Sequence, residues 1–266
     1  MGVSWDLDGL DLDAYLDRVG VAAREPSADA LAELVRAHIT AIPFDNVDVL
    51  LGTHPGVALP VVFDKLVTRR RGGYCFEHAT LLAAALDRLG YPVRRRVGRI
   101  RPQGTGPRTH MVVLATADGV EHLADVGFGS GMWRPVPLRD GERSDQAGWP
   151  HLLTRDGATW TMAARGDDGW EPAYSWDDAG DRPVDAEMGH HFTSTHPSSP
   201  FVGSLVVVRL AEGSLRRLVG TTLRVEDPSG ATEQREITRE DMPATLRDLG
   251  VELPDDVLDA LLARLY

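Results

Sequence analysis

The single cysteine of the chain, Cys75, is the first residue whose type and setting suggest chemistry. It follows Gly72-Gly73-Tyr74 and opens a segment of helical periodicity, which predicts that it lies in the first turn of a helix. Free N–H groups and the dipole at a helix N-terminus favour negative charge, and the thiolate is the reactive form of cysteine. Free cysteines are also often buried and inert, so Cys75 is either a nucleophile or a core residue.

A cysteine nucleophile needs a base, and the base needs a group that orients it. Met111–Ala115 and Val120–Val126 are strand-like runs that flank the turn signal Ala117-Asp118-Gly119, so they predict a β-hairpin. His110 opens one strand of this hairpin and Asp125 lies at the end of the other. The two are therefore candidates for the base and its orienting carboxylate.

The register of the hairpin decides whether these two side chains meet. A tight turn centred on Ala117-Asp118 places His110 opposite Asp125, whereas one centred on Asp118-Gly119 places Asp125 opposite Val112, a diagonal neighbour of His110. Both registers put the two side chains on one face of the sheet. A three-residue loop or a bulge would turn one of them to the opposite face.

Other interpretations stay open on spacing alone. His78 and His122 compete for the role of base, and a histidine at a strand end is often a surface or satisfied residue. Asp125 could instead cap a turn before Gly127. The triad Cys75, His110 and Asp125 is thus a hypothesis from pattern.

The elements that must position these residues follow from periodicity and breakers. Helical patterns occupy the first ninety or so residues, short β-branched runs follow, and the tail returns to helix, which predicts an α+β protein with helices at one end. The expected helices are those around Leu12–Val19, the segment after the N-cap Ser27, Cys75–Leu89, Pro243–Leu249 and Pro254–Leu265; the further expected strands are Val93–Val97, Thr159–Ala163, Leu205–Leu210 and Thr222–Val225.

Composition limits the class of protein. The length of 266 residues favours two or three packed modules, and the net charge of -12 argues against nucleic acid or an anionic membrane as partner. One cysteine excludes an internal disulfide and a zinc site with two thiolates, so we expect no metal. The sequence lacks an apolar run of about 18 residues and a signal-peptide pattern in residues 1–17, so we expect a cytoplasmic protein.

Longer motifs point to a known family. The segment Arg71-Gly72-Gly73-Tyr74-Cys75-Phe76-Glu77 resembles the Arg-Gly-Gly-x-Cys-x-Glu signature of the arylamine N-acetyltransferases of bacterial type. Thr109-His110 and Asp125-Val126-Gly127-Phe128-Gly129 are similar to the histidine and aspartate segments of that family. Ile42-Pro43-Phe44-Asp45-Asn46 and Ser194-Thr195-His196-Pro197 also agree, so the resemblance spans nearly the whole chain.

The resemblance implies a papain-like cysteine enzyme fold in three modules. Residues 1–90 would form a helical bundle that carries the cysteine, residues 91–200 an antiparallel β-barrel that carries His110 and Asp125, and residues 201–266 an α/β lid. It also implies that Cys75, His110 and Asp125 are catalytic. The expected oxyanion donor is the backbone N–H of Cys75.

The resemblance further implies the substrates. Acetyl-CoA would be a cosubstrate, without a tightly bound cofactor, and a small aromatic amine or hydrazine would accept the acetyl group by a ping-pong mechanism through an acetyl-cysteine thioester. The bulky Met132-Trp133 pair departs from the small residues expected in the CoA loop. The implied acceptor-pocket residues are Phe44, Phe128 and Phe201, and the implied CoA-binding residues are Gly127, Gly129, Ser130 and Gly131.

Three alternatives are weighed against this prediction. A macrolactam-forming amide synthase of the same family would have an identical triad but take a long acyl chain from a carrier protein. A papain-like peptidase or transglutaminase would act on peptides without CoA. A binding module with an inert Cys75 is the reading that composition alone favours.

Overall fold

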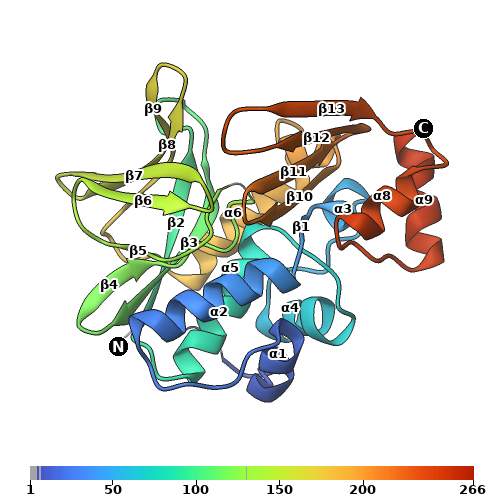
Figure 1. The fold of residues 1–266 in the computed structure, drawn as a ribbon. Coiled ribbons are helices and arrows are strands. Elements are labelled where there is room, and N and C mark those ends of the chain that lie inside the picture. Colours follow the sequence, from blue (N-terminus) through green and yellow to red (C-terminus); the bar gives the residue numbers. More distant parts are fainter. Residues whose placement is uncertain (1–4, 6, 130) are drawn as a thin grey trace.

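A helical layer formed by the first part of the chain carries Cys75. The computed structural model describes residue 5 and residues 7–129 and 131–266. Most of these helices lie beneath the two sheets in Figure 1, and Asp11 and Ser27 cap the first two of them. The helical elements are α1 (Leu12–Val19), α2 (Ala28–Ala41), α3 (Val47–Leu50), α4 (Leu59–Phe63), the π-helical turn η1 (Asp64–Thr68) and α5 (Cys75–Arg88).

A barrel-like antiparallel sheet follows α5. The order of its strands is β5-β4-β3-β2-β9-β8-β7-β6, and the edge strands β5 and β6 contact each other, so the sheet is nearly closed. Its interior is filled by large side chains such as Trp160, Tyr174 and Trp176. The strands are β2 (Val93–Ile100), β3 (Arg108–Ala117), β4 (Val120–Leu123), β5 (Val136–Pro137), β6 (Glu142–Gln146), β7 (Trp149–Asp156), β8 (Thr159–Gly166) and β9 (Gly169–Asp177).

Two helices, α6 (Pro183–Thr195) and α7 (Pro200–Gly203), lead from the barrel to a second sheet, and α6 packs against β3. The second sheet consists of β1 (Phe44–Asp45), β10 (Val206–Ala211), β11 (Ser214–Val219), β12 (Thr222–Glu226) and β13 (Thr232–Glu236). Helices α8 (Met242–Asp248) and α9 (Asp255–Leu265) contribute to its core. Because β1 pairs with β10, a strand from the helical first part of the chain belongs to the same sheet as the strands after residue 200.

The order of elements confirms the predicted α+β fold, with a helical start, an antiparallel barrel and an α/β end (Figure 1). The proposed division at residues 90/91 and 200/201 stays a prediction. Across the described ranges, no helix is both long and apolar enough to cross a bilayer.

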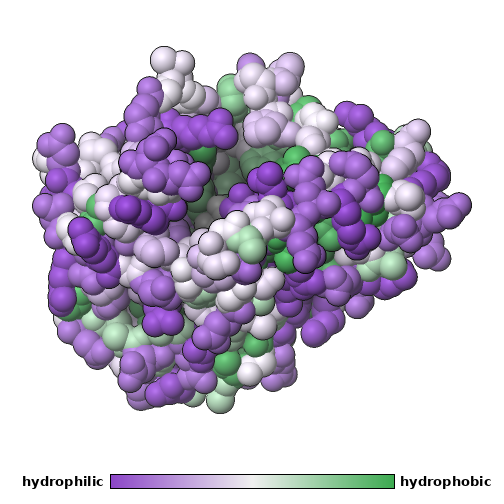
Figure 2. Space-filling view, turned by 45° about the horizontal axis from the view of Figure 1, so that its top comes forward, coloured by the Kyte–Doolittle hydropathy of each residue, from purple (hydrophilic) through white to green (hydrophobic). Residues whose placement is uncertain are grey.

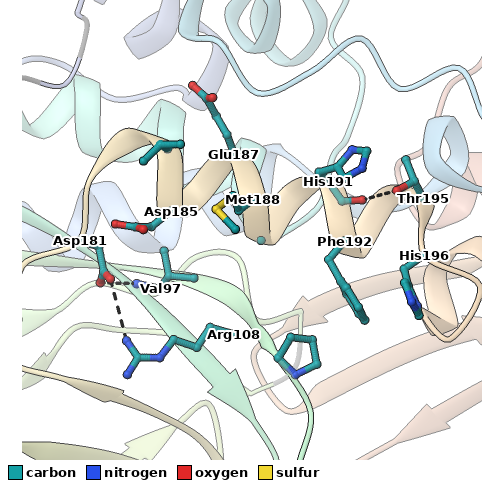
Figure 3. A pocket seen from close by; sticks show the side chains of 13 residues that line it. Val97, Arg108, Asp181, Asp185, Glu187, Met188, His191, Phe192, Thr195 and His196 are labelled. Atoms are coloured by element: carbon teal, nitrogen blue, oxygen red, sulfur yellow. Dashed lines mark hydrogen bonds and ion pairs between the residues drawn. The ribbon is translucent and has the colours of Figure 1, made fainter.

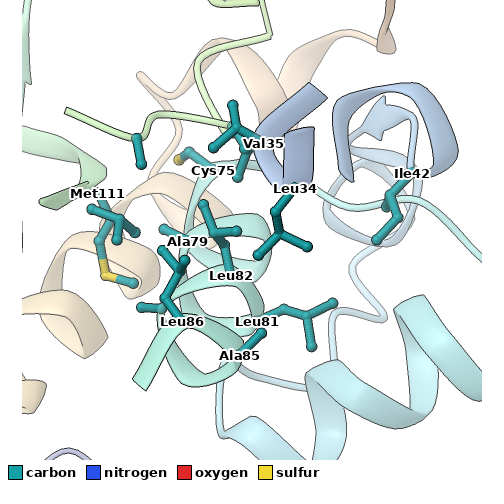
Figure 4. Close-up of a cluster of buried hydrophobic side chains, with 14 of the residues drawn as sticks. Leu34, Val35, Ile42, Cys75, Ala79, Leu81, Leu82, Ala85, Leu86 and Met111 are labelled. Carbon is teal, nitrogen blue, oxygen red and sulfur yellow. The ribbon is translucent and has the colours of Figure 1, made fainter. Parts of the chain in front are cut away.

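The helix α5 is the centre of the largest core. Leu82 and Leu86 are fully buried and lie among side chains of α2 and β3, including Leu34 and Met111 (Figure 4). Cys75 stands at the edge of this cluster, at the first turn of α5. A helix buried on several sides has little freedom to move, so its first turn is a rigid place for a reactive side chain.

Candidate active site

The start of α5 is fixed by a side chain of its own first turn. Glu77 accepts a hydrogen bond from the backbone N–H of Tyr74 at 3.0 Å, which satisfies one of the free donors of the helix N-terminus. Cys75 is the next residue, and its side chain is 4% exposed. The Sγ atom lies 3.6 Å from the carbonyl oxygen of Thr109, the residue before His110. Strand β3 therefore passes directly beside the thiol.

The hairpin formed by β3 and β4 brings His110 and Asp125 together. Its strands are joined by the two-residue turn Asp118-Gly119, which is the second of the two registers considered above. Continued past β4, this register places Asp125 opposite Val112, diagonally across from His110. The Nε2 atom of His110 lies 2.7 Å from Oδ2 of Asp125, and both side chains are buried.

The hydrogen bonds set the charge and the tautomer of His110. A carboxylate only accepts hydrogen bonds, so Nε2 donates to Asp125 and Nδ1 remains for Cys75. Burial by itself would lower the pKa of His110, but the charge and hydrogen bond of Asp125, together with Cys75, raise that pKa to about 10. A protonated His110 at neutral pH favours negative charge on the adjacent sulfur.

The same pair stabilises the ionised form of Asp125. Burial would raise the pKa of this carboxyl, but His110, the neighbouring Tyr174 hydroxyl and the backbone N–H of Gly127 lower it. Gly127 donates to Oδ1 of Asp125 at 3.0 Å. The Asp125 carboxylate thus stabilises the protonated form of His110, and the hydrogen bond from Gly127 fixes the position of this carboxylate.

A pocket of about 470 Å³ opens above Cys75 and His110. In Figure 2, a hollow with apolar residues on its floor lies between the barrel and the second sheet and is surrounded by hydrophilic surface. The three predicted acceptor-pocket residues all line the pocket above Cys75, and the rings of Phe44 and Phe201 lie 6.0 Å apart. The pocket is lined by Phe44, Cys75, Ile100, Arg101, Gly106, Pro107, Thr109, His110, Gly127, Phe128, Phe192, Thr193, Ser198, Ser199, Pro200 and Phe201.

The predicted CoA-binding residues have different surroundings. Gly127 lines the pocket, whereas a side chain on Gly129 would meet the ring of Phe44 and one on Gly131 would meet His151. Ser130 lies outside the described residues. A role of these residues in CoA binding stays a prediction.

The unexpected Met132-Trp133 pair is explained by packing. Met132 is buried in the barrel core, and Trp133 is buried against the core around α5. Gln146 Oε1 accepts hydrogen bonds from the backbone N–H groups of Trp133 and Arg134 at 2.7 and 2.8 Å. The bulky pair therefore anchors the end of the loop.

The competing histidines have other partners. Nδ1 of His78 lies 2.9 Å from Nε2 of His38, and Nε2 of His78 lies 3.1 Å from the carbonyl oxygen of Gly73. His122 bonds through Nδ1 to the carbonyl oxygen of Val120, two residues away. His110 is the histidine that pairs with Asp125.

Sequence reasoning missed Tyr174 and Phe192. The ring of Tyr174 on β9 lies 4.8 Å from that of His110 and 4.7 Å from that of Phe128, measured between centroids, so it limits their movement. Phe192 reaches the pocket from α6. The alternating aromatic residues of β9 were a signal for a half-buried strand, and the apolar residues at four-residue spacing that end at Phe192 were a signal for the helix α6.

A buried ion-pair network braces the turn before Cys75. Lys65 Nζ lies 2.8 Å from Glu77 and 2.9 Å from Asp48, and Arg71 lies 2.7 Å from Asp48. Arg71 and Glu77 of the signature segment thus have structural partners. No group of three metal-binding side chains suitable for an ion occurs within the described ranges.

The sequence and the fold are similar to those of known acetyltransferases. Residues 27–256 match the model of a family described as N-acetyltransferase. An arylamine N-acetyltransferase of Mycolicibacterium smegmatis is 36% identical over 92% of this chain and 94% of its own length. That of Mycobacterium tuberculosis strain H37Rv is 35% identical over 85% and 83%.

Solved structures of arylamine N-acetyltransferases have the same fold as this chain. The crystal structure of the Nocardia farcinica arylamine N-acetyltransferase has a TM-score of 0.90 and 39% identity, covering 98% of this chain and 96% of that one. The Mycobacterium marinum enzyme in complex with CoA has a TM-score of 0.89 and 36% identity, covering 96% and 98%. The chain therefore belongs to the arylamine N-acetyltransferase family and is an acetyl-transferring enzyme.

Proposed function

We propose that this enzyme moves an acetyl group from acetyl-CoA to small aromatic amines or hydrazines by a ping-pong mechanism, through a thioester on Cys75. The observation that carries the proposal is the 2.7 Å contact between His110 and Asp125 at a pocket that also exposes Cys75. This is the arrangement of nucleophile, base and orienting carboxylate that acyl transfer requires.

In the first half-reaction, the Cys75 sulfur attacks the acetyl carbon of the donor, with its proton held by Nδ1 of His110. The carbon–sulfur bond of the donor breaks, and His110 gives the proton to the leaving CoA sulfur. The negative charge on the intermediate oxygen needs fixed donors, and the backbone N–H of Cys75 at the start of α5 is the proposed one.

In the second half-reaction, the amine attacks the acetyl-Cys75 carbonyl after CoA has left. His110 takes the proton of the amine and returns one to the Cys75 sulfur, which regenerates the enzyme. Asp125 keeps Nδ1 directed at the sulfur in both halves by accepting from Nε2. The catalytic roles of all three residues are part of the proposal.

The pocket supports an aromatic acceptor and a CoA donor. Phe44, Phe128 and Phe201 offer flat apolar walls to an aromatic ring. Arg101, exposed at the same pocket, is a guanidinium that can receive a phosphate charge. The complex of the Mycobacterium marinum relative with CoA adds support for the donor. A reactive free thiol fits a reducing compartment, so we propose cytoplasmic activity.

The test is intact mass spectrometry after incubation with acetyl-CoA alone, beside a Cys75→Ala variant. We expect one acetyl adduct that requires Cys75 and disappears when an aromatic amine or hydrazine is added. An adduct that persists in Cys75→Ala, or transfer that needs donor and acceptor together, would contradict the proposed mechanism.

The amide synthase is the second candidate, because a further hollow lies next to the catalytic pocket on the other side of Phe192. It would be supported if acetyl-CoA left Cys75 unmodified while bulky acyl thioesters acylated it.

A further inference from the structure

A second hollow, of about 770 Å³, lies along α6 next to the catalytic pocket. The two spaces share the lining residues Pro107 and Phe192 and otherwise have different walls. Pro107 comes directly before β3, whereas Phe192 comes from α6. These two side chains therefore mark the place where the hollow and the pocket meet.

One face of α6 forms the apolar side of this hollow. Val184, Met188 and Phe192 are spaced by four residues, so they follow one another along the same side of the helix. Val184 is 52% exposed and Met188 is 67% exposed, an unusual position for large apolar side chains. Val97 of β2 also lines the hollow. The lining thus suits an apolar group.

The charges at the hollow argue against phosphate. Asp181, Asp185 and Glu187 line it, and Arg108 is already paired with Asp177 and with Asp181. Figure 3 shows the pair with Asp181. A CoA pyrophosphate would be repelled by these carboxylates. These carboxylates would not repel an uncharged aliphatic chain.

Phe192 is held in position at the junction. Figure 3 shows its ring projecting from α6 on the side where Arg108 lies. The ring stacks on His196, with centroids 4.2 Å apart and planes 12° apart. Rotation of Phe192 would break this stack, so the side chain is a fixed part of the wall.

We propose that Phe192 determines acyl-chain specificity: it confines the acyl group on Cys75 to the catalytic pocket, and the hollow along α6 is the space that a longer aliphatic chain would occupy without it. This inference rests on the proposed function. An acyl group stays on Cys75 while the acceptor enters, so a long chain must leave the catalytic pocket to make room.

The chemistry is the same for every chain length. The bond from Cys75 Sγ to the acyl carbon forms, the bond from that carbon to the CoA sulfur breaks, and the proton held by His110 goes to the CoA sulfur. Phe192 takes no part in these steps. It changes only which acyl groups fit.

The test measures acylation of Cys75 by intact mass, with acetyl-, butanoyl-, hexanoyl- and octanoyl-CoA as probes. In the unmodified enzyme, the rate should fall with chain length. In Phe192→Ala, acylation by octanoyl-CoA relative to acetyl-CoA should rise by about tenfold or more, because a few methylenes are accommodated rather than rejected. Phe192→Leu should give a smaller gain, and Phe192→Trp should slow butanoyl transfer.

A second substitution tests whether the chain uses the hollow. Met188→Trp should leave acetylation unchanged in the otherwise unmodified enzyme, but it should remove the gain when combined with Phe192→Ala. Octanoyl transfer as fast as acetyl transfer in the unmodified enzyme, or unchanged selectivity in both Phe192→Ala and Phe192→Leu, would overturn the inference. Absence of any acetyl adduct in the unmodified enzyme would instead overturn the proposed function on which it rests.

Discussion

Gly127 lies so close to Cys75 that no side chain fits between them. A Cβ atom on Gly127 would stand 2.8 Å from Cα and 2.9 Å from the carbonyl oxygen of Cys75. The same glycine donates its N–H to Asp125. The loop that follows the aspartate and the turn that carries the cysteine are thus in direct backbone contact.

The first prediction concerns this contact. Gly127→Ala should push the loop away from α5 and lower acetyl transfer by about 10²-fold, because a shift of about 1 Å at a reacting group has that effect. The rate of Cys75 acetylation by acetyl-CoA measures it. Gly180→Ala is the matched control, since no atom lies near a Cβ at that position. Equal rates of Cys75 acetylation in Gly127→Ala and Gly180→Ala would show that the close contact between Gly127 and Cys75 is not needed for acetyl transfer.

The second prediction concerns the charge on His110. Asp125→Asn removes the carboxylate that helps raise the pKa of His110 to about 10, so this pKa should fall toward its ordinary range. Acetyl transfer should fall by about 10²- to 10⁴-fold. Titration of the His110 ring by NMR measures the pKa directly. Asp140→Asn removes an exposed carboxylate and should change neither quantity.

The hairpin shows how far sequence reasoning reached. The alternation of apolar residues and the turn signal Ala117-Asp118-Gly119 allowed two tight-turn registers that place His110 and Asp125 on one face, and a three-residue loop or bulge that would separate them; the structure has the tight turn at Asp118-Gly119. The choice between them depends on backbone conformation at two residues: Asp118 and Gly119 both have positive φ, 49° and 74°. Asp-Gly is a preferred pair for two-residue turns with positive φ at both positions, so the local sequence favoured the register that the structure has.

Helix α6 is one of the elements that were not predicted from the sequence. Val184 and Met188 are exposed on the side of α6 that lines the hollow. Gly189 lies so close to the ring of Phe76 that a Cβ atom at this position would stand 2.9 Å from it. The packed face of this helix is formed by the small residues Ala186, Gly189 and Thr193, while its large apolar side chains lie on another face. The four-residue spacing that ends at Phe192 is visible in the sequence, but periodicity alone does not tell that this face borders a hollow instead of the core.

The third prediction concerns the buried ion pairs beneath the cysteine turn. Glu77→Gln leaves Lys65 with less opposite charge in an apolar setting, so it should lower the free energy of unfolding by about 3–5 kcal/mol. Urea unfolding at pH 7 measures the loss. Glu212→Gln is a control at an exposed turn. A double variant with Lys65→Met should recover part of the loss, because the uncompensated charge is removed.

The pH dependence of this carboxylate follows from its pKa. Burial would raise the pKa of Glu77, but Lys65 and His54 lower it to about 2. Its stabilising effect should therefore be complete above the unfolded value of about 4.3 and disappear as pH falls toward 2. If Glu77→Gln cost the same stability at pH 7 and at pH 2.5, the ionised carboxylate would not be the cause.

The fourth prediction concerns buried histidines that are uncharged in the folded protein at neutral pH. Burial lowers the pKa of His78 and of His190 to about 4, and it also lowers that of His38 well below the ordinary value. In the unfolded chain they bind protons near pH 6.5, so the native state should lose stability as pH falls from 6.5 to 4. Each such proton contributes a slope of about 1.4 kcal/mol per pH unit. His110 has a raised pKa and acts in the opposite direction, but its contribution changes mainly above pH 6.5, so it adds little slope toward pH 4.

His190 allows this prediction to be checked with a single substitution. His190→Gln removes one of the titrating groups, so it should lower stability at pH 7, where the contact with Tyr74 is lost, and reduce the slope between pH 6.5 and 4. His196→Gln is the control, because His196 is exposed. The measurement is the free energy of urea unfolding at pH 7, 6 and 5. An unchanged slope in His190→Gln would mean that this histidine binds a proton as readily in the folded protein as in the unfolded chain, and that its packing against His54 and Tyr74 does not exclude the charge.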